Sequence, residues 1–196
     1  MNIVVVKYNA GNIFSVINGL KRIGVEPTLS GDPEIIRAAD KVIFPGVGEA
    51  STTMAYLRET KLDQVIRDLK QPTLGICIGL QLMCKSSEEG NTQCLGIFDE
   101  EVKKFVPTLH EQKVPHMGWN TLEEMNSPLF KNLPQNPFVY YVHSFCASIG
   151  QNTIAQTNYI QPYSAALHKN NFYAVQFHPE KSGHIVEIIL KNFIEL

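Results

Sequence analysis

Three residues of this 196-residue chain have the types and surroundings needed for thiol chemistry, and the first is Cys77. It lies at the centre of Gly75-Ile-Cys-Ile-Gly79, after an apolar run at 73–76 that predicts a buried strand and before a stretch that predicts a helix. A strand, a tight turn and a helix, with a glycine two residues to either side, are typical of a nucleophile elbow. The positive end of the helix dipole favours the thiolate, and the turn exposes the sulfur above the sheet. The alternative is an inert cysteine in a strand-to-helix turn.

The other two residues, His178 and Glu180, lie in Gln176-Phe-His-Pro-Glu180. A thiol nucleophile needs a base, and the base needs a third group that fixes its orientation. In an extended segment the two side chains point to the same side, and Pro179 is expected to keep the segment extended. The alternative is a surface loop in which both side chains are solvated.

A third motif, Pro45-Gly-Val-Gly48, follows an apolar run at 41–44. A glycine-rich turn exposes backbone N–H groups, and one aimed at a developing oxyanion is worth roughly 3–4 kcal/mol. Such a turn could instead hold a phosphate or be a plain connection. The chain has no GxGxxG and no Walker A lysine nearby, which disfavours nucleotide binding.

The elements that must position these motifs alternate between strand and helix in the first half of the chain. Asn12 is expected to cap a helix that Gly24 ends, and Asp32-Pro33 to begin another. Strands are predicted at 3–6, 26–30, 41–44 and 73–76, and helical segments at 13–23, from 33, around 54–59, at 62–70 and at 79–84. This alternation predicts crossover units and a mostly parallel sheet, whose strand ends gather the motifs at one edge.

The second half of the chain has a strand-like pattern without a strong helix until its end. Strands are predicted at 102–106, 119–122, 138–145, 153–157, 164–167 and 172–177, and a helix at 185–194. We therefore expect residues 1–196 to form a single three-layer α/β domain with a mostly parallel central sheet, an antiparallel extension and a closing helix.

Composition excludes several classes of function. Charged residues make up 18% and the net charge is −2, which gives no basic surface for nucleic acid or for a membrane. Neither a membrane span nor a signal peptide is present in the sequence, so a cytoplasmic protein is expected. The four cysteines form no CxxC pair and the six histidines have no metal-ligand spacing, so we expect no metal and no cofactor.

Together the three motifs resemble the triad-type, class I glutamine amidotransferases. The resemblance rests on Gly75-Ile-Cys77-Ile-Gly79-Leu-Gln81, Pro45-Gly-Val-Gly48 and Gln176-Phe-His178-Pro-Glu180. Further stretches resemble the branch of this family that serves histidine synthesis: Ala10-Gly-Asn12, Pro115-His-Met-Gly-Trp-Asn120, Tyr140-Tyr-Val-His-Ser-Phe145 and His178-Pro-Glu-Lys-Ser182. The resemblance extends over nearly the whole chain and implies a flavodoxin-like core.

The resemblance also implies a reaction and its residues. Cys77 would attack the side-chain amide of glutamine and form a glutamyl thioester, while His178 protonates the departing ammonia and then activates water. Glu180 would orient His178. The residues implied to stabilise the oxyanion are Val47 and Ile78, and those implied to bind glutamine are Gly46, Gly48, Gln81, His143, Ser144 and Phe145.

In this branch of the family, ammonia passes to a (β/α)8-barrel cyclase that forms a heterodimer with the glutaminase, and the glutaminase is weak until the cyclase binds its nucleotide. A peptide flip at Val47 would provide such gating. The resemblance makes Asn12, Trp119 and Lys181 candidates for the interface. Lys7 and Asn9 depart from the acidic residue and the glycine that the family usually has there.

Three other functions remain open on the sequence alone. One is a stand-alone thiol hydrolase, such as a peptidase or γ-glutamyl hydrolase. Another is a flavodoxin-like binding protein with an incidental cysteine, and the third is an amidotransferase with a different synthase partner. Cys84, Cys94 and Cys146 are interpreted as small apolar side chains.

Overall fold

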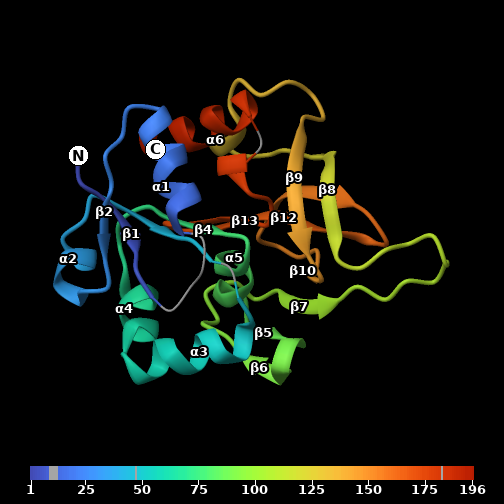
Figure 1. The fold of residues 1–196 in the computed structure, drawn as a ribbon, viewed down its shortest axis with the longest axis horizontal. Coiled ribbons are helices and arrows are strands. Elements are labelled where there is room, and N and C mark those ends of the chain that lie inside the picture. Colours follow the sequence, from blue (N-terminus) through green and yellow to red (C-terminus); the bar gives the residue numbers. More distant parts are fainter. Residues whose placement is uncertain (9–12, 47, 182) are drawn as a thin grey trace.

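The structure is a computed structural model that describes residues 1–8, 13–46, 48–181 and 183–196. A central sheet crosses the molecule with helices on both faces (Figure 1). The strands of its parallel part are β1 (Ile3–Val6), β2 (Thr28–Ser30), β3 (Lys41–Phe44), β4 (Thr73–Ile76) and β13 (Phe172–Val175), in the spatial order β2-β1-β3-β4-β13. The predicted parallel sheet is therefore confirmed.

The sheet continues beyond β13 as an extension that is mainly antiparallel. It contains β12 (Pro162–Lys169), β10 (Phe145–Ala147), β7 (Glu101–Lys104), β5 (Ser86–Ser87) and β6 (Thr92–Gln93), with β11 (Thr153–Asn158) beside β12. A separate two-stranded sheet consists of β8 (His116–Thr121) and β9 (Phe138–His143). The expected antiparallel extension is thus present, with this hairpin as an additional layer.

The helices cover the sheet on two sides. α1 (Ile13–Arg22) and α6 (His184–Glu195) lie on one face, and α3 (Ala50–Glu59), α4 (Leu62–Asp68) and α5 (Ile78–Met83) lie on the other (Figure 1). The short α2 (Pro33–Arg37) lies near the β2 edge of the sheet. Three 3-10 turns, η1 (Glu89–Asn91), η2 (Pro128–Phe130) and η3 (Pro179–Lys181), complete the elements.

Each buried strand supplies two cores because its side chains alternate between the faces. Ile3 and Val5 of β1 pack in the core under α1 and α6, whereas Val4 and Val6 pack under α3, α4 and α5. This explains why the strand is apolar at every position. No helix within the described ranges is long and apolar enough to cross a membrane.

Local signals account for several element ends. The Asp32 side chain caps α2 by accepting from the Glu34 backbone N–H at 2.8 Å, with Pro33 in the first turn. Gly24 has φ +83° and follows the last turn of α1, as expected of a left-handed helix end. The cap expected at Asn12 lies outside the described residues.

One strand prediction was wrong in a way that matters for the site. The segment 138–145 is not a single strand, because it is interrupted at Ser144. β9 pairs with β8, whereas β10 pairs with β7 and β12 in the large sheet. The chain therefore crosses between sheets at Ser144. The short β5 and β6 were not predicted, and the other differences are small shifts at element ends.

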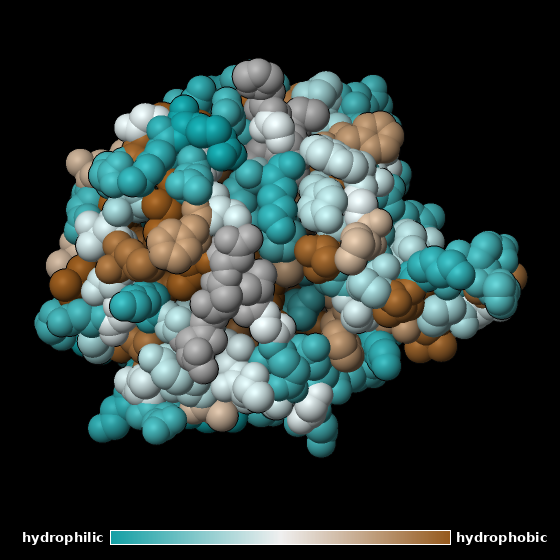
Figure 2. All heavy atoms as spheres, in the orientation of Figure 1, coloured by the Kyte–Doolittle hydropathy of each residue, from teal (hydrophilic) through white to brown (hydrophobic). Residues whose placement is uncertain are grey.

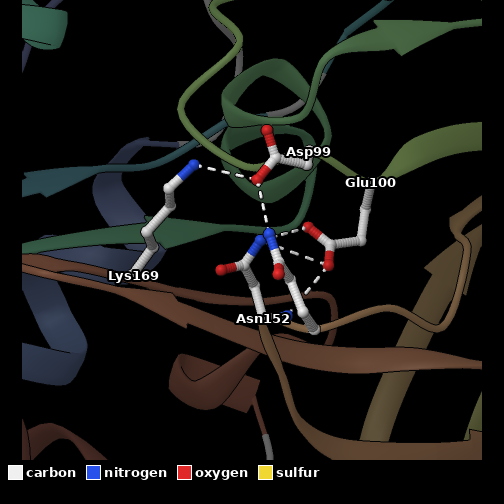
Figure 3. A network of polar contacts seen from close by, with 5 residues as sticks. Asp99, Glu100, Asn152 and Lys169 are labelled. Atoms are coloured by element: carbon white, nitrogen blue, oxygen red, sulfur yellow. Dashed lines mark hydrogen bonds and ion pairs between the residues drawn. The ribbon is translucent and has the colours of Figure 1, made fainter.

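Two loops of the extension are connected by a buried carboxylate. Glu100, which is 4% exposed, accepts hydrogen bonds from the Asn152 backbone N–H at 3.0 Å and from its side-chain Nδ2 at 2.9 Å (Figure 3). Beside it the exposed Asp99 accepts from Lys169 at 3.0 Å. The contacts of Glu100 join the loop before β7 to the loop before β11, and that of Asp99 joins the first of these loops to the end of β12.

The loop between β7 and β8 projects from the body of the molecule (Figure 1). Figure 2 shows mainly hydrophilic atoms on this arm, mixed with a few hydrophobic ones. The exposed apolar side chains in it include Val106 and Leu109.

Candidate active site

Cys77 occupies the turn between β4 and α5, where the sequence places the nucleophile elbow. Its φ of 54° and ψ of −110° are unusual for a residue with a side chain, and such strain is typical of functional sites. An added Cβ at Gly79 would lie 2.2 Å from the Phe44 carbonyl oxygen, so only glycine permits this close approach of α5 to β3. Cys77 is 7% exposed, so the residue is less accessible than the sequence suggested, and it lines a pocket.

His178 and Glu180 follow β13, the parallel neighbour of β4. The His178 Nδ1 atom and Glu180 Oε1 are 2.8 Å apart, and both side chains are buried. Pro179 does not keep this segment extended: residues Pro179–Lys181 form η3, because the fixed φ of proline also suits the first position of a helical turn. The two side chains meet through this turn instead of through an extended backbone.

The contacts of His178 favour its protonated form. Burial alone would lower the pKa of His178, but hydrogen bonds with Cys77 and Glu180, together with the negative charges these groups can carry, raise it to about 10. The imidazole is therefore positioned between a sulfur and a carboxylate. Its backbone N–H donates to the Tyr140 carbonyl at 2.9 Å, which connects the histidine to β9.

A pocket of about 340 Å³ opens beside the sulfur. Five of the residues predicted to bind glutamine line it together with Cys77, Ile78 and His178; these five are Gly48, Gln81, His143, Ser144 and Phe145. The segment that crosses between the two sheets at Ser144 forms one wall. The structure thus brings together residues that lie far apart in the sequence.

Two predicted residues have different surroundings from the rest. Gly46 is not among the described residues that line the pocket; an added Cβ would lie 1.9 Å from the Ile78 side chain, so this glycine permits tight packing. Beside it, the buried Tyr8 hydroxyl donates to the Pro45 carbonyl. The predicted oxyanion donor Val47 lies outside the described residues.

Glu89 lines the pocket although sequence reasoning missed it. Its Oε2 accepts from the Ala50 backbone N–H at 2.7 Å, and burial raises its pKa. It is the one carboxylate among the described lining residues. No motif surrounds it, and a Glu-Glu-Gly stretch at 88–90 is typical of a surface turn, so only the tertiary fold reveals it.

Two of the three interface candidates gather around Tyr140. Trp119 on β8 is 54% exposed and stacks edge-on against Tyr140, with 5.9 Å between ring centroids. The exposed Lys181 places its ammonium 5.8 Å from the centre of the same ring. The third candidate, Asn12, lies outside the described residues, as does Asn9, while Lys7 is exposed.

The remaining cysteines, Cys84, Cys94 and Cys146, are free and buried, in keeping with an apolar packing role. Burial raises the pKa of Cys94 to about 11 and of Cys146 to about 12. In the part of the chain that the structure describes, no group of three or more His, Cys, Asp or Glu side chains could hold a metal ion.

Comparison with known proteins agrees with this geometry. Residues 4–196 match the family described as glutamine amidotransferase class-I, and the chain belongs to that family. Over its whole length it is 60% identical to the imidazole glycerol phosphate synthase subunit HisH of Bacteroides fragilis strain YCH46, with both chains fully covered. It is 43% identical, again with full coverage of both, to the protein of the same name from Escherichia coli K12.

Solved structures show the same fold at low sequence identity. The crystal structure of one glutamine amidotransferase superposes with a TM-score of 0.75 at 20% identity, covering 98% of this chain and 97% of the other. A glutamine amidotransferase from Thermotoga maritima gives a TM-score of 0.63 at 15% identity, covering 100% and 81%. The predicted fold class is confirmed.

Proposed function

We propose that this chain is the glutaminase subunit of imidazole glycerol phosphate synthase. It hydrolyses glutamine to glutamate and ammonia, and a (β/α)8-barrel cyclase partner uses the ammonia to form imidazole glycerol phosphate and an aminoimidazole carboxamide ribonucleotide in histidine biosynthesis. The observation that carries the proposal is the buried Cys77–His178–Glu180 constellation at the pocket. The identity of 60% to a named synthase subunit supports the choice of pathway.

The chemistry begins at the sulfur. The Cys77 thiolate attacks the side-chain carbonyl carbon of glutamine, so that a carbon–sulfur bond forms and the carbonyl oxygen becomes an oxyanion. His178, which is protonated at neutral pH because its pKa is about 10, donates its proton to the amide nitrogen as the carbon–nitrogen bond breaks. Ammonia leaves, and a glutamyl thioester remains on Cys77.

Water then completes the reaction. His178, now neutral, takes a proton from a water molecule that attacks the thioester, and glutamate departs as the carbon–sulfur bond breaks. Glu180 holds the Nδ1 side of the ring, so that Nε2 serves the reacting atoms. Ile78, the first residue of α5, offers its backbone N–H to the oxyanion, and the sequence leads us to expect a second donor at Val47.

The pocket suits the charged end of glutamine. Glu89 provides a carboxylate for the α-ammonium group. The backbone of Ser144 and Phe145 and the glycine-rich turn at Gly48 provide polar groups for the α-carboxylate. Gln81 also lines the pocket. Its side chain is held in place because its Nε2 donates to both the Phe145 carbonyl and Gln176 Oε1 at 2.9 Å.

Docking of the partner would use the face formed by Trp119 and Lys181, with Asn12 as a further contact expected from the sequence. The Tyr140 ring is covered by Trp119 and Lys181, while the Tyr140 carbonyl accepts from the His178 backbone N–H. A partner bound at this face would therefore lie next to Tyr140, whose backbone carbonyl binds His178 directly. We also propose that residues 1–196 act as one glutaminase domain in the cytoplasm.

Glutamate release tests the proposal. It should be measured with this chain alone, with its barrel cyclase, and with the cyclase plus its nucleotide substrate, using Cys77→Ala as the control. We expect strong stimulation only in the complete mixture and none in the variant. Equal activity in all three mixtures would contradict the partner and favour a stand-alone thiol hydrolase.

A further inference from the structure

His143 lines the pocket, yet both of its ring nitrogens are engaged inside the protein. Nδ1 lies 2.7 Å from the Phe145 carbonyl oxygen, and Nε2 lies 3.3 Å from the Tyr163 hydroxyl. The residue is 6% exposed. Its ring therefore has no nitrogen left with which to bind a substrate directly.

The partners of His143 fix where its proton lies. A carbonyl oxygen can only accept, so Nδ1 carries the hydrogen and donates it to Phe145, and Nε2 accepts from the Tyr163 hydroxyl. Burial lowers the pKa of His143 to about 3, so the ring stays neutral in this tautomer at physiological pH. The Tyr163 oxygen in turn lies 3.2 Å from Nδ1 of the buried His116, which holds the hydroxyl from the other side.

The carbonyl that His143 holds is central to the pocket. The Phe145 oxygen also accepts from Gln81 Nε2, and that amide reaches Gln176, whose Nε2 lies 3.8 Å from the Cys77 sulfur. A single carbonyl therefore links the wall of the pocket to the helix of the nucleophile. It belongs to the first residue of β10, which pairs with Lys104 of β7, and it lies directly after Ser144, where the chain leaves β9.

We infer that His143 is a positioning residue for glutamine recognition: by donating from Nδ1 to the Phe145 carbonyl, it holds the Ser144–Phe145 backbone in the conformation that binds the α-carboxylate end of L-glutamine. The inference rests on the proposed function, because it assigns a role in binding that substrate. His143 sets the affinity for glutamine and leaves the bond-breaking steps to Cys77 and His178.

Two substitutions at His143 separate this role from a general structural one. Asparagine places an amide N–H near the position of Nδ1, whereas glutamine places its amide near Nε2. In the complex with the cyclase and its nucleotide substrate, H143N should keep the KM for glutamine within about threefold, whereas H143Q should raise it about tenfold, the cost of one hydrogen bond. The kcat at saturating glutamine should change little in either variant.

Binding measured without turnover provides a second readout. Calorimetric titration of L-glutamine into complexes that also carry Cys77→Ala should show the same order, with H143Q binding about tenfold more weakly than H143N. Equal KM values for H143N and H143Q, or a fall in kcat alone, would overturn the inference while the parent enzyme stays active. A parent that releases no glutamate from glutamine would instead overturn the proposed function, and this inference with it.

A third variant covers the case in which H143Q does not fold. Tyr163→Phe keeps the ring and removes only the hydroxyl that donates to Nε2, so KM should rise by about threefold, a smaller change in the same direction. Tyr159→Phe is the matched control: its ring stacks on His116, but its hydroxyl donates to the Lys113 carbonyl, outside this set of contacts. An unchanged KM in Tyr163→Phe would overturn the inference.

Discussion

At the scale of single residues, the site combines strain with charge pairing. Cys77 is held at positive φ, where its sulfur faces the pocket, and His178 lies between that sulfur and Glu180. The raised pKa of His178 follows from these two contacts, because burial by itself would act in the opposite direction. In the proposed reaction the histidine is therefore an acid while ammonia leaves and a base afterwards.

Removal of the Glu180 carboxylate should change both the pKa of His178 and the rate of the reaction. In Glu180→Gln we expect the pKa of His178 to fall from about 10, because the negative charge that favours the imidazolium is lost and a neutral amide oxygen is a weaker acceptor. We expect kcat to fall more than about tenfold as the ring loses its fixed tautomer, with little change in the KM for glutamine. NMR titration of the His178 ring and steady-state kinetics measure the two quantities.

The exposed Glu195 at the end of α6 provides the control for this experiment. Glu195→Gln removes a carboxylate from the surface and should leave both the titration and the rate unchanged. A His178 titration that is identical in Glu180→Gln and the parent would contradict the assigned origin of the shift.

At the scale of elements, the site depends on how strands end. β4 and β13 are parallel neighbours, so their carboxyl ends bring Cys77 and His178 together although about 100 residues separate them in the chain. The extension supplies the opposite wall through the crossing at Ser144. Its loops are in turn secured by Glu100 and Asn152 (Figure 3).

This buried contact should contribute measurably to stability. Glu100→Gln keeps the size of the side chain but turns one acceptor into a donor that faces the donors of Asn152. We expect the free energy of unfolding to fall by about 1–3 kcal/mol, the cost of leaving buried polar groups unsatisfied. Asp99→Asn, at the neighbouring exposed carboxylate, should change stability little. Urea unfolding of both variants tests this, and equal effects would contradict the role of burial.

The sequence was informative wherever one local pattern determines the outcome. The parallel strands, the elbow at Cys77 and the pairing of His178 with Glu180 followed from apolar runs, glycine spacing and a short motif. The break at Ser144 did not, because apolar and aromatic residues occur on both sides of it and only the pairing of distant strands divides the segment. Glu89 was missed for a related reason: its place in the pocket depends on a loop packed against α3.

At the scale of the whole molecule, an aromatic and histidine cluster fills the space between the hairpin and the large sheet. The ring of His116 stacks on Tyr159 at 3.9 Å and on Tyr141 at 4.8 Å, and His143 lies 5.3 Å from His116. Burial lowers the pKa of His116 to about 4 and that of His143 to about 3. Two neutral histidines therefore belong to the packing that joins the two sheets.

This packing predicts how stability depends on pH. Because the folded-state pKa values of His116 and His143 lie below the unfolded value of about 6.5, the unfolded chain binds more protons, and stability should fall as the pH drops from 6.5 towards 4. Each histidine contributes at most about 1.4 kcal/mol per pH unit in that window. His178, with its raised pKa, contributes stability that is constant below pH 6.5 and lost towards pH 10, so it does not alter the acid slope.

Urea unfolding between pH 6.5 and 4.5 should therefore show that stability depends less steeply on pH in His116→Gln than in the parent. His110→Gln, at an exposed position, should keep the pH dependence of the parent. Parallel curves for His116→Gln and the parent would mean that His116 is not held neutral by the fold.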